Sequence, residues 1–432
     1  MRRLLIALGL FSPLIAKLPP SDLSADKASY DQEILTLTGN VTVDHSLGQL
    51  KGERAILHKH KHTFAFSTIE LQSNVSFFSL EHGSLFAETA FFDLEKRAAT
   101  LSANGYPVLY KGPTYQLTAK TIDLTLDQGY AIDTLAAEGD VFIENLDGFS
   151  IDCNKATSHQ NTLTAFGPPC HCKHNLDAID ADSLTYNRAT SLLSFVRPKG
   201  ILSSPLFPND PTKQCRFVAE TLLWNQIEEV LTLEKNIQID DPTFGTLIGK
   251  DLLTLKQKRV FDQKNLESIT ATGETTLISK ENERLTNYGT MTLDQETLLL
   301  TCTNPPNCQL KYEKETLLLF ADKAEAEYTF QGTKIAPHTL RFDGNVRILS
   351  HDLSRPLRKG LADHLIHNPH TQETRLIADE GNAVLFWDEE KKYALSAPEI
   401  LINHQEEDLV KGIGTVRFFF TEEEGKRIEE FF

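Results

Sequence analysis

Hydrophobic and polar residues alternate along most of the chain in short stretches that share one order. The order is apolar, x, apolar, x, Gly, x, Val, x, apolar, where x is mostly polar. This period of two places the apolar residues on one face of a β-strand, so each copy predicts a half-buried strand. The clearest copies are Leu35, Leu37, Gly39, Val41, Val43; Ile69, Leu71, Ser73, Val75, Phe77; Leu135, Ala137, Gly139, Val141, Ile143; Leu231, Leu233, Lys235, Ile237, Ile239; and Leu340, Phe342, Gly344, Val346, Ile348.

The glycine at the centre of this signature predicts a local irregularity in the strand. A glycine removes one side chain from the apolar row, which is typical of a bulge, a bend or a close backbone approach. Asparagine tolerates such backbone, and it follows the central position at Asn40, Asn74, Asn236, Asn345 and Asn382. Weaker copies lie at residues 101–105, 269–277, 377–385 and 410–418.

A second signature lies between the copies of the first and reads Ala, then Asp or Glu, x, and a small or apolar residue. The central positions Gly39, Ser73, Gly105 and Gly139 are spaced 34, 32 and 34 residues apart. Such a unit cannot bury its apolar row alone, so its neighbours must cover it. We therefore expect an all-β fold, an elongated jelly-roll or solenoid-like stack of antiparallel strands with an apolar interior. The second signature begins at Ala25, Ala87, Ala181, Ala219, Ala321 and Ala362, with variants at Gly52 and Ala119.

The ends and interruptions of the pattern predict the domain organisation. Residues 1–16 have the charged start and short apolar stretch of a secretory signal peptide, which predicts export to the periplasm. Proline-containing sequence weakens the repeat before residue 212 and at residues 304–307. We expect repeat regions over residues 17–212, 213–303 and 304–420, followed by a charged tail over residues 421–432.

The repeated residues resemble the OstA-like domains of the lipopolysaccharide transport system. The resemblance rests on Ala25-Asp26-Lys27-Ala28 leading through Tyr30 to Leu37-Thr38-Gly39-Asn40-Val41, then Leu50-Lys51-Gly52-Glu53-Arg54-Ala55, and it recurs over residues 321–346. It implies a stack of antiparallel strands whose two sheets enclose an apolar groove for acyl chains. It also implies two kinds of partner: lipopolysaccharide or another acylated lipid, and other transport proteins of this system joined by strand addition at the ends.

The inward apolar rows are the candidate lipid-binding residues. Moving one methylene out of water is worth about 0.8 kcal/mol, so a chain of roughly 14 carbons needs a shielded path. The same rows suit a closed core that holds no ligand. The candidate residues are Leu35, Leu37, Val41, Val43, Ile69, Leu71, Val75, Phe77, Val141, Ile143, Leu231, Leu233, Ile237, Ile239, Phe342, Val346 and Ile348.

Charge and motifs argue against several other functions. The net charge of -17 opposes binding to nucleic acid phosphates. The sequence has no phosphate-binding glycine loop, nucleophile elbow or zincin motif, so we expect neither a catalytic residue nor a cofactor. Two alternatives to a lipid-transport bridge stay open: a structural or adhesive β-solenoid with a closed core, and a polysaccharide-active β-helix enzyme.

Cysteine and histidine clusters suggest disulfides before metal sites. In an oxidising compartment, Cys302 and Cys308 flank a Pro-Pro turn and form the predicted disulfide. His58, His60 and His62 alternate along the chain and could bind a metal ion, but a polar hairpin tip is the favoured interpretation. Cys170, His171, Cys172 and His174 form a second possible set of metal ligands, for which disulfides are the favoured interpretation.

Overall fold

The computed structural model describes most of the chain between residues 22 and 420. The omitted stretches within that range are 46–47, 60–65, 80–82, 113–114, 128–131, 147, 175–176, 204–212, 261–262, 316, 332–333, 353–354, 390–391 and 404–408. The predicted signal peptide, the charged tail, His60 and His62 lie outside the described residues, so those expectations stay predictions.

All regular secondary structure in the described ranges is β-strand, which confirms the predicted all-β class. Every strand pair whose register is described is antiparallel, as alternating half-buried strands require. The described residues contain no helix of the length and hydropathy needed to cross a membrane. The chain divides into two compact units: unit 1 contains Met1–Gly200 and Asn225–Ile227, and unit 2 contains Ile201–Trp224 and Glu228–Phe432.

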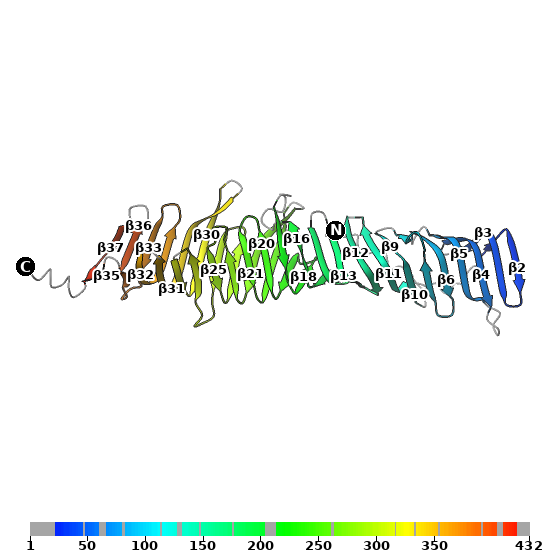
Figure 1. Cartoon of the computed structure of the whole chain (residues 1–432), viewed down its shortest axis with the longest axis horizontal. Coiled ribbons are helices and arrows are strands. Elements are labelled where there is room, and N and C mark those ends of the chain that lie inside the picture. Colours follow the sequence, from blue (N-terminus) through cyan, green and yellow to red (C-terminus); the bar gives the residue numbers. More distant parts are fainter. Residues whose placement is uncertain are drawn as a thin grey trace, which may run out of the picture. The chain divides into compact units, whose positions relative to one another are not determined.

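Unit 1 begins with long strands that pair in chain order. Strand β3 (Ile34–His45) pairs with β1 (Asp22–Ser24), β2 (Lys27–Asp31) and β4 (Gly48–Lys59), and the series continues through β5 (Phe66–Ser79) and β6 (Gly83–Asp93). The next level is split, so that β7 (Ala98–Ser102) pairs with β10 (Thr121–Leu126) and β8 (Val108–Lys111) pairs with β9 (Tyr115–Ala119). Both branches rejoin at β11 (Ile132–Asn145), which is followed by β12 (Phe149–His159), β13 (Thr162–His174), β14 (Asp177–Asn187) and β15 (Leu192–Val196) (Figure 1). The next strand, β16 (Lys199–Ser203), contains the end of the first stretch of unit 1 and the start of unit 2.

Unit 2 is built from two ladders of shorter strands that meet at long strands near its C-terminal end. After β17 (Gln214–Val218) and β18 (Thr221–Asn225), one ladder runs β19 (Val230–Glu234), β22 (Leu252–Val260), β23 (Gln263–Thr272), β26 (Thr290–Asp294), β27 (Leu299–Thr303) and β30 (Lys323–Gln331). The other runs from β17 through β20 (Ile237–Asp241), β21 (Gly245–Gly249), β24 (Thr275–Ile278), β25 (Arg284–Asn287), β28 (Leu310–Lys314) and β29 (Leu317–Ala321).

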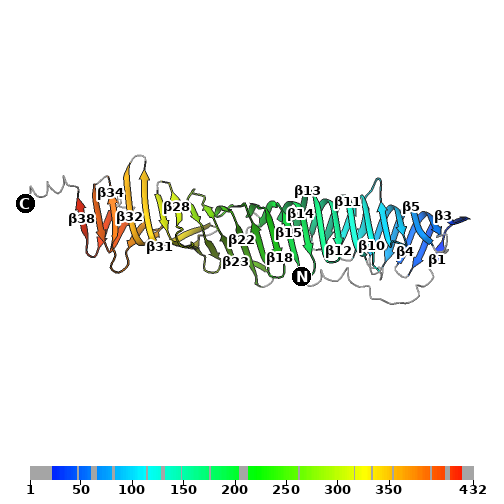
Figure 2. The ribbon, with the colours of Figure 1, turned by 90° about the horizontal axis from the view of Figure 1, so that it is seen from below.

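Both ladders of unit 2 pair with β31 (Lys334–Asp352), which pairs in turn with β32 (Arg355–Asn368). Two branches follow, and β34 and β38 of one branch are labelled in Figure 2. One contains β33 (Glu373–Ile377), β36 (Glu399–Asn403) and β37 (Leu409–Ile413), and the other contains β34 (Val384–Asp388), β35 (Tyr393–Ala397) and β38 (Arg417–Phe420).

A β-bulge lies within β3, β5, β11 and β31, as the first signature predicts, and also within β13. Gly39 and Asn40 of β3 together oppose the single residue Glu53 of β4, so β3 bends at this point. Both residues are left-handed, with φ values of 80° and 46°. A Cβ added at the equivalent Gly344 would lie 2.6 Å from an Asp322 carboxylate oxygen, which explains why that position is a glycine.

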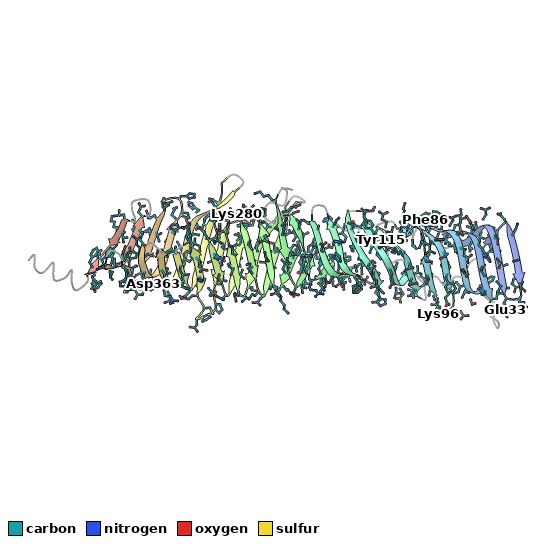
Figure 3. All side chains as sticks on the ribbon, in the orientation of Figure 1. Glu33, Phe86, Lys96, Tyr115, Lys280 and Asp363 are labelled. Atoms are coloured by element: carbon teal, nitrogen blue, oxygen red, sulfur yellow. The ribbon has the colours of Figure 1, made fainter. Side chains whose placement is uncertain are left out.

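The two sequence signatures meet at these bulges. The asparagine of the first signature donates a side-chain hydrogen bond to the acid of the second, which lies on the adjoining strand or in the bend between two adjoining strands, and this contact stabilises the irregular backbone. The Nδ2-to-oxygen distances are 2.9 Å for Asn40 to Asp26, 2.7 Å for Asn74 to Glu53, 3.1 Å for Asn236 to Glu220, 2.7 Å for Asn345 to Asp322 and 3.0 Å for Asn382 to Asp363, the last acid being labelled in Figure 3.

Two copies have an ion pair in place of the asparagine-to-acid hydrogen bond, with a lysine at the acid position and an acid at the asparagine position. Lys120 occupies the acid position and forms an ion pair of 2.7 Å with Asp140, which occupies the asparagine position. Lys250 and Glu274 form the same exchanged pair at 2.5 Å. The exchange preserves an attractive contact between the two positions, which indicates that their interaction belongs to the repeat.

Three details of the strand pattern differ from expectation. Residues 148–203 continue the repeat, because the prolines of β13 lie at its bulge, where ladder donors are not needed. Gly105 lies in a connection between β7 and β8 instead of a bulge within one strand. Four copies that each predicted one strand divide into two strands instead: 231–239 into β19 and β20, 269–277 into β23 and β24, 377–385 into β33 and β34, and 410–418 into β37 and β38. The three predicted repeat regions stay a prediction.

Candidate functional site

The candidate lipid-binding residues all lie on one face of their strands, which we call the inward face. Within each copy, the two residues that flank the bulge are buried: Leu71 and Val75 are 0% and 1% exposed. These positions lie next to the bend in each copy, where side chains of the neighbouring strands pack against them. The buried candidates are Leu37, Val41, Leu71, Val75, Val141, Leu233, Ile237, Phe342 and Val346.

The next residues outward along the same face are only partly buried. Phe77 lies two residues beyond Val75 and keeps part of its surface accessible to solvent. The same grading occurs in every clear copy, although a closed core filled by side chains would bury these positions as completely as the first. The partly exposed candidates are Leu35, Val43, Ile69, Phe77, Ile143, Leu231, Ile239 and Ile348.

Partner strands add residues to the inward face that the first signature did not identify. The second signature supplies Ala87 and Ala90, each 1% exposed, while Glu88 between them lies opposite the bulge. Leu57, which is 2% exposed, lies opposite Leu35 in the register of β3 and β4. The sequence of β4 could have predicted that Leu57 faces inward, because the apolar residues Leu50, Ala55 and Leu57 lie on either side of Gly52 in an alternating pattern.

Tyrosine side chains complete the inward face at several outer positions. The rings of Tyr110 and Tyr115, the latter labelled in Figure 3, lie 5.3 Å apart between centroids. Burial raises the pKa of both phenols, and their hydroxyls hydrogen-bond to each other. In unit 2, burial likewise raises the pKa of Tyr312 and Tyr328. These phenols are neutral at physiological pH, so they add area and hydrogen-bonding groups to the interior without adding charge.

The inward face of unit 2 also contains polar groups, which sequence reasoning missed. Arg358 and Asp388 lie opposite each other on β32 and β34, and the arginine Nε is 3.1 Å from the aspartate carboxylate. Their side chains are 21% and 1% exposed. Asn287, at 0% exposure, lies opposite Thr275, and neither polar atom of its side chain has a hydrogen-bond partner. Each departure replaces an apolar residue at an inward position, so the interior of unit 2 is less uniformly apolar than the pattern predicts.

In the group of Cys170, His171, Cys172 and His174, strand alternation separates the cysteines from His171. Cys170 and Cys172 are buried on the inward face, whereas His171 between them hydrogen-bonds Asp180 through Nδ1 at 2.5 Å. Of the three clustered histidines, His58 alone lies within the described ranges. Across those ranges, no group of three or more His, Cys, Asp and Glu side chains is arranged to hold a metal ion.

The predicted disulfide between Cys302 and Cys308 is not formed in the structure, where both are free thiols. Cys302 is 1% exposed and lies on β27 opposite Met291, whereas Cys308 is exposed in the following turn. The two sulfurs therefore occupy different environments although the Pro-Pro turn joins them. Burial raises the pKa of the Cys302 thiol to about 12, which keeps it protonated and weakly nucleophilic.

Comparisons with known proteins assign no family. No protein-family model matches the chain, and no curated protein matches it. Among solved structures, it is similar to LptH from Pseudomonas aeruginosa, described as the LptA-homologous periplasmic component of the conserved lipopolysaccharide transport device. That match has 13% sequence identity, covers 35% of this chain and 80% of that chain, and has a TM-score of 0.18. A likeness at this level does not bear on function.

Proposed function

We propose that the chain is a non-enzymatic lipid-binding protein that holds acyl chains along the inward faces of its strands. The observation that carries the proposal is the graded exposure of these faces, which is repeated in every clear copy. Residues beside the bulge form a packed base, and apolar residues further out stay partly accessible. An acyl chain that covers the outer residues removes both its own surface and theirs from water, which favours binding.

The finer proposal is that the ligand is a lipopolysaccharide-type lipid and that the chain is part of a transport bridge in the periplasm. It is supported by the resemblance of the two signatures to OstA-like domains and by the signal-like residues 1–16. A lipid with several acyl chains needs a continuous shielded path, because each chain of roughly 14 carbons resists crossing water by about 10 kcal/mol. Repeated inward faces at successive levels of one unit suit such a path.

We also propose that the terminal strands bind other lipopolysaccharide transport proteins, or a second copy, by strand addition. β2 pairs with β3 at one end of unit 1, and β38 pairs with β35 at one end of unit 2. An end strand offers backbone donors and acceptors to another chain. Exposed apolar side chains accompany them, since Tyr30 and Phe418 are each 56% exposed. Shared backbone pairing would continue the inward face from one molecule into the next.

Proline substitutions at neighbouring positions of β38 test this docking role. Successive residues of an antiparallel edge strand direct their N–H groups alternately toward the partner strand and away from it. Of Arg417→Pro and Phe418→Pro, one therefore removes an outward donor and should weaken self-association, measured by native mass spectrometry across a concentration series. The other should mainly loosen the contact with β35. Unchanged association in both variants would rule out docking through this edge.

A pair of adjacent phenylalanines provides a matched test of lipid binding. Phe77 lies on the inward face beside Leu50 and Leu85, whereas Phe78 is 44% exposed on the opposite face, where it packs edge-on against Phe86. Phe77→Asp should abolish lipid retention in native mass spectrometry, because an unpaired carboxylate in an apolar site costs several kcal/mol. Phe78→Asp should retain it.

Circular dichroism and thermal unfolding of both variants establish that each is folded. Two folded variants that retain lipid equally would contradict the assignment of the inward face and would favour a closed structural solenoid. Wild-type protein without any bound lipid, after purification and after incubation with lipopolysaccharide, would contradict lipid binding altogether.

A further inference from the structure

Cys153 and Cys170 lie beside each other on neighbouring strands of unit 1. Asp152 of β12 pairs with His171 of β13, and each cysteine lies one residue beyond this pair, at the point where the register of the two strands shifts. Both side chains are on the inward face, with exposures of 4% and 1%. The Cα atoms of a directly opposed pair such as Asp152 and His171 are roughly 4.5–5.5 Å apart, so the adjacent cysteines lie close to the separation that a disulfide spans.

Both cysteines are free thiols in the structure, and the two thiols contact each other. Their side chains hydrogen-bond, and this contact lowers the pKa of Cys153 while it raises that of Cys170. Cys153 also donates a hydrogen bond to the main-chain oxygen of Lys155, with an Sγ-to-O distance of 3.4 Å. Cys172 is a third inward thiol, but it pairs with Ile151 and lies one inward position away from Cys153. The pairing geometry therefore selects Cys170 as the partner of Cys153.

This thiol pair lies next to a break in the backbone ladder. Between Phe166 and Cys170 the register of β13 shifts against both of its neighbours. The intervening sequence is Gly167-Pro168-Pro169, and the two prolines have no N–H to donate. In the described ranges, five other bends have an asparagine-to-acid contact and two have an ion pair at the same positions, whereas the acid at this bend, Asp182, forms an ion pair with Arg197.

We propose that Cys153 and Cys170 form a disulfide that joins β12 to β13 at this bend when the chain folds in an oxidising compartment. The Cys153 thiolate attacks an external disulfide and releases one thiol. The Cys170 thiolate then attacks the mixed disulfide at Cys153, releases the second thiol and leaves the S–S bond. Two cysteine thiols are oxidised, two protons are lost, and one external disulfide is reduced to two thiols. The proposal rests on the export that the proposed function includes.

The cross-link is tested on the full chain refolded from denaturant in a glutathione redox buffer, so that the thiols meet the oxidant before they are buried. Alkylation under denaturing conditions, followed by non-reducing peptide mapping, should recover a Cys153–Cys170 linked peptide and reduce the titratable thiols from the six of the sequence to about four. Cys172→Ser should keep the linked peptide, and Cys153→Ser should abolish it. Oxidised wild-type protein should unfold at a higher denaturant midpoint than reduced protein, and Cys153→Ser should lose this difference.

Recovery of alkylated Cys153 and Cys170 from refolded wild-type protein, or linkage of Cys153 to Cys172, would overturn the proposal. The same mapping of the chain exported to the periplasm of a diderm host provides a second measurement that does not depend on refolding. The chemistry in the refolding experiment is independent of lipid. A missing cross-link in protein that binds lipid therefore contradicts the disulfide alone, and a cross-link in protein that binds no lipid contradicts the proposed function alone.

Discussion

Replacement of Asp388 by alanine is expected to lower the free energy of unfolding of unit 2 by about 3 kcal/mol. The carboxylate is almost completely buried and lies 3.1 Å from the Arg358 guanidinium on the inward face. Its removal leaves an arginine charge in a mostly apolar setting without its closest counter-ion. Partial exposure of Arg358 to solvent places the expected cost at the lower end of the range for buried pairs. Chemical denaturation followed by the fluorescence of the adjacent Trp387 measures the effect.

The double substitution Arg358→Met with Asp388→Leu is the matched control. It removes both charges and keeps apolar volume, so its stability should lie within about 1 kcal/mol of the wild type. If Asp388→Ala and the double variant are equally destabilised, the loss reflects packing at these positions. Such a result would contradict the assignment of a buried ion pair.

Ile237→Asp is expected to unfold the surrounding strands of unit 2. Ile237 is 1% exposed at the start of β20, next to the bend that separates it from β19, so the substitution creates a cavity and buries a carboxyl group. The combined cost is on the order of 4 kcal/mol or more. The variant should show a clear loss of stability in denaturant unfolding and faster amide hydrogen exchange in β19–β22.

Ile248→Asp controls for the introduced charge. Ile248 lies on β21, is 42% exposed and faces away from the interior, opposite Gln238. This variant should change stability by less than about 0.5 kcal/mol. Equal destabilisation by the two substitutions would show that the inward face of this copy is wrongly assigned.

The strands and their bends follow from local sequence, and this part of the fold could be predicted. Alternation over nine residues identifies the inward face, and a central residue such as Gly39 identifies the bulge. The contact between the two signatures was not predicted, although its members recur in fixed order. The pairs Lys120 with Asp140 and Lys250 with Glu274 could have revealed this contact, because a lysine at the acid position occurs together with an acid at the asparagine position.

Other features of the site depend on pairings between distant strands. Arg358 and Asp388 are separated by 30 residues, and a single sequence does not reveal that both project inward at neighbouring positions. The proximity of Cys153 and Cys170 depends on the shift of register that Gly167 and the following prolines introduce. The exposure of outer residues depends on the spacing between the two ladders, which the alternating pattern does not encode.

Photo-crosslinking in living cells tests the central claim most directly. A photoreactive phenylalanine analogue is placed at Phe77, on the inward face, or at Phe78, on the opposite face 44% exposed to solvent. After irradiation in a diderm host, immunoblotting with an antibody to lipopolysaccharide and mass spectrometry identify the adducts. The account predicts lipid adducts at position 77 and few or none at position 78. Equal adducts at both positions, or none at position 77 in folded protein, would contradict it.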